Sequence, residues 1–301
     1  MRIVPPMPDL SPNALGAIYM TLGSLAYVVN DALVRVATEE GVDVYQALFV
    51  RGCGMILIFA MASRRRGERL DRSSFTRPLV GRVVAEVVGT ALFFAALVNL
   101  EFANAQTILM LVPFAVTLVA ARLGEEVSGR RYLLVAVGFA GVIAVVRPTP
   151  DAFSAWSLLV VGAAMALVVR EFATRRVSSD IPPLPIALLT AISITSMMGL
   201  ISIVTGWGAV TTVAAAALVA ACLCLVAGYL FVIETVRVGD LSVSAPFRYT
   251  SVIGAVVVGL VLFDEIPDTL TIVGCCLIVL AGVITARSDR PSKVVLDFNQ
   301  G

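Results

Sequence analysis

The chain has 301 residues, of which 59% are hydrophobic and 14% charged, and its formal net charge is +1. In a soluble domain about a quarter of the residues are charged. This chain has too few charged residues to cover its surface as a soluble protein does, which indicates that it lies in a lipid bilayer. The small net charge gives no support for nucleic-acid binding. The five cysteines lie in apolar runs, and the chain has no histidine that could complete a set of zinc ligands with them. We therefore expect neither a metal nor a cofactor.

Ten apolar segments follow one another along the chain, each long enough to cross about 30 Å of hydrocarbon. We predict an all-α membrane protein, because lipid-exposed backbone must satisfy its own hydrogen bonds and the segments lack the alternation of barrel strands. The first segment is expected to stay in the membrane as an uncleaved anchor. The predicted transmembrane helices cover residues 13–33, 45–62, 79–98, 104–121, 131–147, 154–171, 184–205, 211–234, 242–263 and 269–286.

The basic residues predict the orientation, because cytoplasmic connections carry a positive excess. Placing the N-terminus in the cytoplasm puts most of the 22 Lys and Arg residues inside, whereas Arg35, Arg51 and Arg147 fall in outer connections. The outer connections are instead rich in Asp and Glu. We therefore expect a multi-pass protein of the bacterial inner membrane with cytoplasmic tails at residues 1–12 and 288–301.

An internal repeat divides the chain into two halves. Residues 118–147 and 257–287 share an apolar helix, an acidic pair, a short turn and a glycine-bearing helix that ends in arginine. The halves, 13–148 and 154–287, contain five predicted helices each. Five is odd, so the second half is inverted in the membrane. Inverted repeats place a solute site near the midplane and permit alternating access.

Three stretches resemble the drug/metabolite transporter superfamily in its ten-helix EamA-type branch. They are YVVNDALVR around Asn30, PFAVTLVAARLGEE from Pro113 to Glu126, and APFRYTSVIGAVVVGLVLFDE after Ser244, where Asp264 stands in place of the family's usual glycine. The resemblance covers nearly the whole chain and implies a transporter, not an enzyme. Within the superfamily the chain is most similar to bacterial amino-acid and metabolite exporters, including the aromatic-amino-acid exporter type.

Glu86 is the clearest candidate for a functional residue, since an ionisable group inside a span is costly and usually faces a cavity or a partner. Thr90 and Phe93 follow it on the same helical face. Two interpretations stay open: Glu86 takes up a proton or binds an ammonium group, or it is a structural partner of Arg82 or of a hydroxyl. The first predicts that Glu86→Gln abolishes any proton dependence of transport.

The other candidates are polar or aromatic residues within the predicted helices. Asn30 and Tyr27 are expected to line a cavity, whereas Asp31 is equally compatible with an outer interface position paired with Arg35. Arg170 either snorkels or binds a solute carboxylate. The remaining cavity candidates are Tyr229, Phe247, Arg248 and Tyr249, of which Arg248 lies deep enough to need a partner and the aromatic residues are equally compatible with packing.

Pro113 and Pro246 are expected to let their helices bend and act as gates, because proline removes an intrahelical hydrogen bond. No motif for ATP use is found in the sequence, so transport would be downhill or coupled to an ion gradient. The expected function is export of small metabolites, chiefly amino acids. The alternatives are another solute, such as a drug, sugar or nucleotide-like compound, and a membrane scaffold or intramembrane enzyme. The sequence leaves open whether the protein forms a homodimer.

Overall fold

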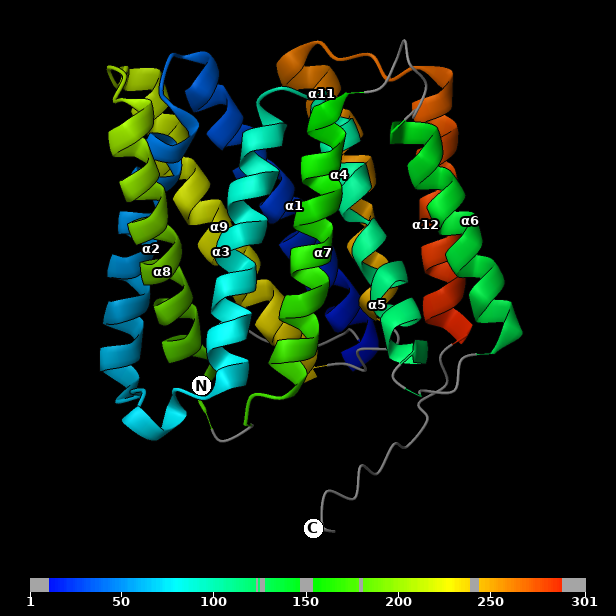
Figure 1. Cartoon of the computed structure of the whole chain (residues 1–301), viewed down its shortest axis with the longest axis horizontal. Helices are drawn as coiled ribbons and strands as arrows, with labels where there is room; N and C mark the ends of the chain where they lie inside the picture. The colour runs from blue at the N-terminus through cyan, green and yellow to red at the C-terminus, as the bar shows by residue number, and fades with distance from the viewer. Residues whose placement is uncertain are drawn as a thin grey trace.

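The structure is a computed structural model, and it describes residues 11–122, 124, 128–146, 154–178, 181–238 and 244–288. Glu125, Glu126, Arg147 and most of both predicted tails lie outside the described residues. Within them the regular structure is helical throughout (Figure 1), as the composition predicts.

The helices follow the predicted spans closely. The first half contains α1 (Pro12–Glu39), α2 (Val44–Arg66), the short helix η1 (Arg72–Ser74), α3 (Arg77–Leu97), α4 (Phe102–Leu109), α5 (Leu111–Arg122) and α6 (Gly129–Val146). The second half contains α7 (Ala155–Arg175), α8 (Pro183–Thr205), α9 (Thr212–Val238), η2 (Ala245–Tyr249), α11 (Thr250–Phe263) and α12 (Thr269–Ser288). Among the described residues, seven segments are long and apolar enough to cross a bilayer, with three shorter apolar helices at 132–145, 247–263 and 269–284.

The fourth and ninth spans are each built from two pieces, which the apolar runs alone do not show. The fourth span changes from α4 to α5 at Met110, just before Pro113, which has no N–H to continue the helical ladder. The ninth span begins with the tighter turns of η2, which contains Pro246, and continues as α11. Pro113 thus lies three residues after a change of helical geometry and Pro246 lies within one, and bending at these prolines stays a prediction.

Local signals fix the helix ends. Ser11 caps α1 by accepting a hydrogen bond from the amide of Ala14, with Pro12 at the first helical position. Asp43 caps α2 in the same way, accepting from the amides of Tyr45 and Gln46. At its other end α2 carries three arginines in the last turn and stops at Gly67, which adopts the left-handed conformation with a φ of 67°.

The two ends of the bundle differ in charge. We call the end at which α2 and α7 finish and α3 begins the arginine-rich end; its residues include Arg64, Arg65 and Arg77. We call the opposite end the acidic end; its connections contain Glu40, Asp43 and Asp264. Figure 1 places the arginine-rich end at the bottom and the acidic end at the top.

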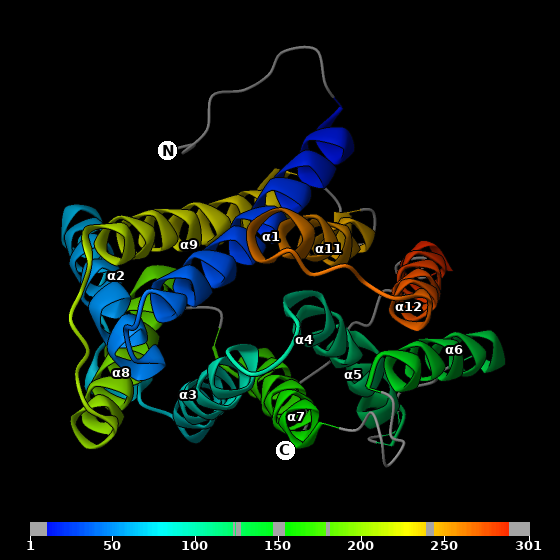
Figure 2. The ribbon, with the colours of Figure 1, turned by 90° about the horizontal axis from the view of Figure 1, so that it is seen from above.

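The helix pairs reveal the symmetry between the halves. The most extensive contacts are those of α1 with α9, α3 with α7, α2 with α8 and α6 with α12. Exchanging the halves converts the α1–α9 pair into the α7–α3 pair and maps each of the other two pairs onto itself. Figure 2 shows the result from above, with α2 and α8 at one side, α6 and α12 at the other, and the remaining spans between them. The fold is thus two inverted five-helix repeats.

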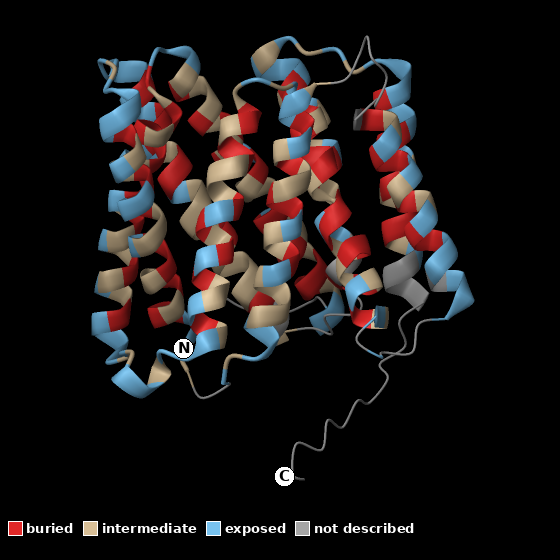
Figure 3. Ribbon diagram, viewed as in Figure 1, coloured by how far each residue is buried: buried red, intermediate tan, exposed pale blue. Residues whose placement is uncertain are grey.

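Burial follows the arrangement. Small and medium apolar side chains fill the contacts between helices, for example Ala32, Ala47 and Ala163. Large apolar residues such as Leu133, Ile203 and Val261 are exposed on the outer surface, and Figure 3 shows exposed positions running along the outward faces of α6 and α2. An apolar outer surface of this kind suits a bilayer.

Candidate functional site

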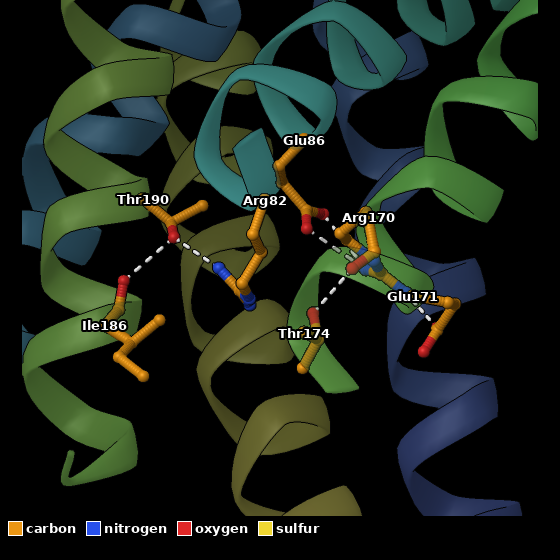
Figure 4. Close-up of polar contacts among 7 residues, drawn as sticks. All are labelled: Arg82, Glu86, Arg170, Glu171, Thr174, Ile186 and Thr190. Atoms are coloured by element: carbon orange, nitrogen blue, oxygen red, sulfur yellow. Dashed lines mark hydrogen bonds and ion pairs between the residues drawn. The ribbon is translucent and has the colours of Figure 1, made fainter. Parts of the chain in front are cut away.

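A cluster of charged side chains lies between α3 and α7, on the arginine-rich side of the bundle centre (Figure 4). Arg170 of α7 donates from Nη1 to both carboxylate oxygens of Glu86 of α3, at 3.2 and 3.1 Å. Its Nη2 donates to Glu171 at 2.6 Å. One guanidinium thus bridges two carboxylates, an arrangement suited to the planar fork of arginine.

The cluster is deep in the span but not sealed. Counted from Arg77 at 1.5 Å per residue, Glu86 lies about 13 Å from the arginine-rich end of α3. The side chain of Glu86 is 19% exposed and that of Arg170 is 27% exposed. Opposite charges at this depth, still in contact with solvent-accessible space, can exchange partners with a charged solute.

Arg82 does not pair with Glu86, so this structural interpretation of Glu86 is wrong. Arg82 instead donates to the hydroxyl of Thr190 on α8 at 2.8 Å, and Thr190 donates in turn to the carbonyl of Ile186. Arg170 is not a freely snorkelling residue either, since it is held by two carboxylates. The charged cluster therefore joins α3 and α7, while Arg82 ties α3 to α8.

A second polar cluster lies nearer the acidic end and connects α1, α2 and α4. Arg51 Nη1 donates to Asn30 Oδ1 at 2.9 Å, and Asn30 Nδ2 donates to Asp31 Oδ1 at 2.8 Å. Gln106 of α4 donates to the other oxygen of Asp31 at 2.7 Å. Arg51 is only 7% exposed, and within the described part of the chain its buried Nε has no hydrogen-bond partner.

Two expectations are corrected by this second cluster. Arg51 lies inside α2 and packs over the ring of Phe94 at 5.3 Å, not in an outer connection. Asp31 is not paired with Arg35; it is held between two amide side chains. Three further carboxylates lie inside helices, those of Asp31, Glu171 and Glu234.

Arg35 closes the acidic end with a separate set of contacts. Its Nη2 forms an ion pair with Glu265 at 2.7 Å, its Nη1 donates to the carbonyl of Leu100 at 3.1 Å, and its guanidinium stacks on Phe263. Glu265 also accepts from the amide of Phe102, the first residue of α4, at 2.6 Å. Burial raises the pKa of Glu265 above its ordinary value, against the opposing attraction of Arg35. We call this set the Arg35–Glu265 contact.

The predicted tyrosines differ in their surroundings. Tyr27 packs against Gly228 of α9 and lies within electrostatic reach of Glu86 and Arg170. Tyr229 stacks on Phe59 at 5.2 Å and donates its hydroxyl to the carbonyl of Pro183 at 3.1 Å. Tyr229 is also within electrostatic reach of Glu86, so both tyrosines lie near the charged cluster, and Tyr229 is in addition fixed by its hydrogen bond to Pro183.

In the described part of the chain none of the remaining predicted residues forms a hydrogen bond or ion pair with the charged pair, although Arg248 lies within electrostatic reach of Glu171. Phe93 is buried edge-on against Phe94 at 5.2 Å. Tyr249 is buried next to Gly282, while its neighbours Phe247 and Arg248 are exposed. Arg248 thus needs no buried partner, in contrast to the expectation from its depth. Thr90 is partly buried, one turn beyond Glu86 on α3.

Sequence reasoning missed three residues that complete these clusters. Glu171 and Arg51 could have been found, because they are charged residues inside apolar helices, and the same criterion identifies Glu86 as a candidate. Gln106 is a buried amide in a short helix, and no sequence signal marks its partner on α1.

Comparisons with known proteins agree with this architecture. A protein-family model described as the EamA-like transporter family matches residues 14–147 and, a second time, residues 154–287. A crystal structure with 19% identity shares the fold with a TM-score of 0.61, over 90% of this chain and 98% of the other.

Two curated relatives span nearly the same length. The pseudopaline exporter CntI of Pseudomonas aeruginosa is 24% identical over 285 residues, covering 91% of this chain and 97% of the relative. A riboflavin transporter of Rhizobium johnstonii is 22% identical over 277 residues, covering 91% and 92% of the two chains.

Proposed function

This chain belongs to the EamA-like transporter family, and from this we propose that it exports small amphiphilic metabolites, chiefly amino acids, across the bacterial inner membrane. Both curated relatives are named as carriers of organic metabolites, one of them an exporter. The N-terminus and C-terminus face the cytoplasm in this proposal, because the arginine-rich end is then the inner end. Glu86, Arg170 and Glu171 would then be reached from the cytoplasm.

The observation that favours an amino acid is the bridged charge cluster. A solute with an ammonium and a carboxylate group matches it in both signs: the ammonium replaces Arg170 beside Glu86, and the carboxylate binds the released guanidinium. A neutral sugar offers no such exchange. Tyr27, within electrostatic reach of these charges, would supply an aromatic surface for the side chain of the solute.

The proposal is tested with the full chain in proteoliposomes. Counterflow of labelled phenylalanine and tryptophan is compared with that of riboflavin and glucose. We expect saturable counterflow of the amino acids, and competition by N-acetyl and methyl-ester analogues weaker by about tenfold or more, since each analogue leaves one charge of the site unpaired. Counterflow of riboflavin or glucose without amino-acid counterflow would establish the alternative solute class. No counterflow of any compound would contradict transport of these solutes.

Variants of the cluster sharpen the assignment. Glu86→Gln and Arg170→Gln should each lower amino-acid counterflow by on the order of tenfold, the usual loss for a charged hydrogen-bond partner. Arg65→Gln changes an exposed arginine in the last turn of α2 and serves as the matched control. Equal effects of all three substitutions would argue against solute binding at the cluster.

A further inference from the structure

Each polar cluster contains one pair of neighbouring residues that occupies an equivalent position in the two halves. Aligning residue 14 with 154 and residue 147 with 287 places Asn30 opposite Arg170 and Asp31 opposite Glu171. In both pairs the first side chain donates to the carboxylate of the next, at 2.8 Å in α1 and 2.6 Å in α7. Because the halves are inverted, Glu171 lies toward the arginine-rich end and Asp31 toward the acidic end.

The partners of the two acids differ in chemistry. Glu86 and Glu171 face a guanidinium, which only donates hydrogen bonds and carries a fixed charge. Asp31 is held by the neutral amides of Asn30 and Gln106, and no ion pair of Asp31 is found among the described residues. An amide both donates and accepts, so it can serve a carboxylate and a carboxylic acid equally well.

Gln106 is the amide that can respond to a proton. The oxygen of Asn30 is already occupied by Arg51, so a turn of that amide would leave the buried arginine without its acceptor. Gln106 has no such second bond among the described residues, and turning its amide would present an oxygen to a protonated Asp31. It lies in the last turn of α4, next to the change of geometry at Met110.

We propose that Asp31 is the proton-binding residue of the transport cycle, with Gln106 as its positioning residue; this rests on the proposed export function. A carboxylate without an ion pair is costly to enclose, and a proton removes that cost. Asp31 takes the proton from outer water when the acidic end is open, and protonation favours closure of that end. The proton leaves to water reaching the bundle from the arginine-rich end, so proton and solute move in opposite directions.

The other charged groups around Asp31 are few and identifiable. Arg51 comes from α2, with Cys222 of α9 near it, and Arg35 lies one turn along α1 in its contact with Glu265. Neither α4 nor α11 carries a charged residue between its bounds. Burial raises the pKa of Glu265 in the connection before α12, so any test must separate Glu265 from Asp31.

The transport test uses an amino acid that shows counterflow in proteoliposomes. For the wild type we expect a pH gradient to drive accumulation, by up to about tenfold per pH unit for one proton exchanged. Asp31→Asn should lose the accumulation while saturable counterflow of the amino acid stays measurable. Glu101→Gln, an exposed carboxylate that also accepts from an amide side chain, is the matched control and should keep both. Gradient-driven accumulation by Asp31→Asn would overturn the proposal. Counterflow without any wild-type response to the gradient would also overturn it, while leaving the export function intact.

A second test needs no solute. Ala103, buried on α4, is replaced by cysteine in a chain without its native cysteines, and its maleimide labelling is followed from about pH 5.5 to pH 8. We expect labelling to increase at least about threefold with pH, because loss of the proton disfavours the closed end. Asp31→Asn should abolish this dependence and Glu265→Gln should keep it. The proposal would be overturned if the pH dependence of labelling disappeared in Glu265→Gln and remained in Asp31→Asn. If Asp31→Asn does not fold, Asp31→Glu must shift the midpoint, and an unchanged midpoint would count against Asp31.

Discussion

Asp264 holds a backbone conformation that the first half of the chain gives to a glycine. Its φ is 52°, in the left-handed region, and at the equivalent position Gly124 has a φ of 95°. A side chain in this region costs about 1–2 kcal/mol relative to the right-handed one, although Asp tolerates it better than most residues. Asp264 is exposed, and among the described residues its carboxylate has no hydrogen bond or ion pair that would compensate.

Asp264→Gly should therefore stabilise the protein. We expect a gain of about 1 kcal/mol in the free energy of unfolding, and a rise of about 2 °C in Tm for a chain of this size. Asp268→Ala is the opposing control: Asp268 caps α12 by accepting from the amide of Thr271 at 3.0 Å, so its loss should lower Tm by a similar amount. The measurement is thermal unfolding in detergent. A lower Tm for Asp264→Gly would show that the aspartate has a compensating contact.

At the residue scale, the sequence predicts single costly residues better than their partners. Glu86, Arg170 and Asn30 are identified because a polar group within an apolar run is conspicuous. Their partners depend on which helices are neighbours: Glu86 contacts Arg170 of the other half, not Arg82 one turn away. The pattern of basic residues wrongly assigns Arg51 to an outer connection, because Arg51 lies close to the start of α2, where the preceding connection ends.

At the scale of elements, α6 and α12 approach each other through glycines. A methyl group added at Gly141 would lie 2.8 Å from the carbonyl oxygen of Gly274, and one added at Gly274 would lie 2.7 Å from that of Gly141. Contacts below 3.0 Å require the helices to move apart. Small residues permit such close packing in membranes, where dispersion and not the hydrophobic effect holds helices together.

Gly141→Ala should accordingly separate α6 from α12 and lower the Tm in detergent by several degrees, as overpacking costs about 1–3 kcal/mol. Gly81→Ala is the matched control, because nothing lies within 4 Å of its added methyl group. There the better helix propensity of alanine should leave Tm unchanged or slightly higher. Similar losses for both variants would mean that the close approach is not what Gly141 provides.

Element positions are predicted well because length and hydropathy alone determine a span. The helices nevertheless extend beyond the apolar runs: α1 reaches Glu39 and α7 reaches Arg175, because helices continue into their polar caps. The interruption at Met110 is hidden by an unbroken apolar sequence, and Pro113 is its only local sign.

At the scale of the whole molecule, the Arg35–Glu265 contact joins the first helix of one half to the last connection of the other, and it also holds the start of α4. The arginine-rich side of the bundle leaves Glu86 and Arg170 in partial contact with solvent. The Arg35–Glu265 contact therefore holds the acidic end together in this conformation, and the proposed transport cycle requires it to break.

A cross-link at this contact should stop transport. Arg35→Cys combined with Glu265→Cys, in a chain without its native cysteines, is joined by a short bifunctional methanethiosulfonate. We expect counterflow to fall by about tenfold or more, since the closed state is then fixed, and a reductant to restore it. Each single-cysteine variant treated in the same way is the control. Full counterflow in the cross-linked protein would show that the acidic end need not open.

The overall plan is the part that the sequence predicts best. The repeat and the odd number of helices in each half lead directly to inversion, and the family match and the helix pairs agree with it. Hydropathy does not say which helices become neighbours, so the pairing of α1 with α9 and of α3 with α7 comes only from the structure.

That exchange of partners between halves has a consequence for biosynthesis. When the ribosome has completed the first half, α1 and α3 are in the membrane but α7 and α9 have not been made. The carboxylate of Glu86, whose partner Arg170 belongs to the second half, must then be sheltered by provisional neighbours, by lipid headgroups or by the insertion machinery, whereas the partners of Asp31 are already present. The protein can reach its native arrangement only after the second half has been translated, so neither half is an autonomous folding unit.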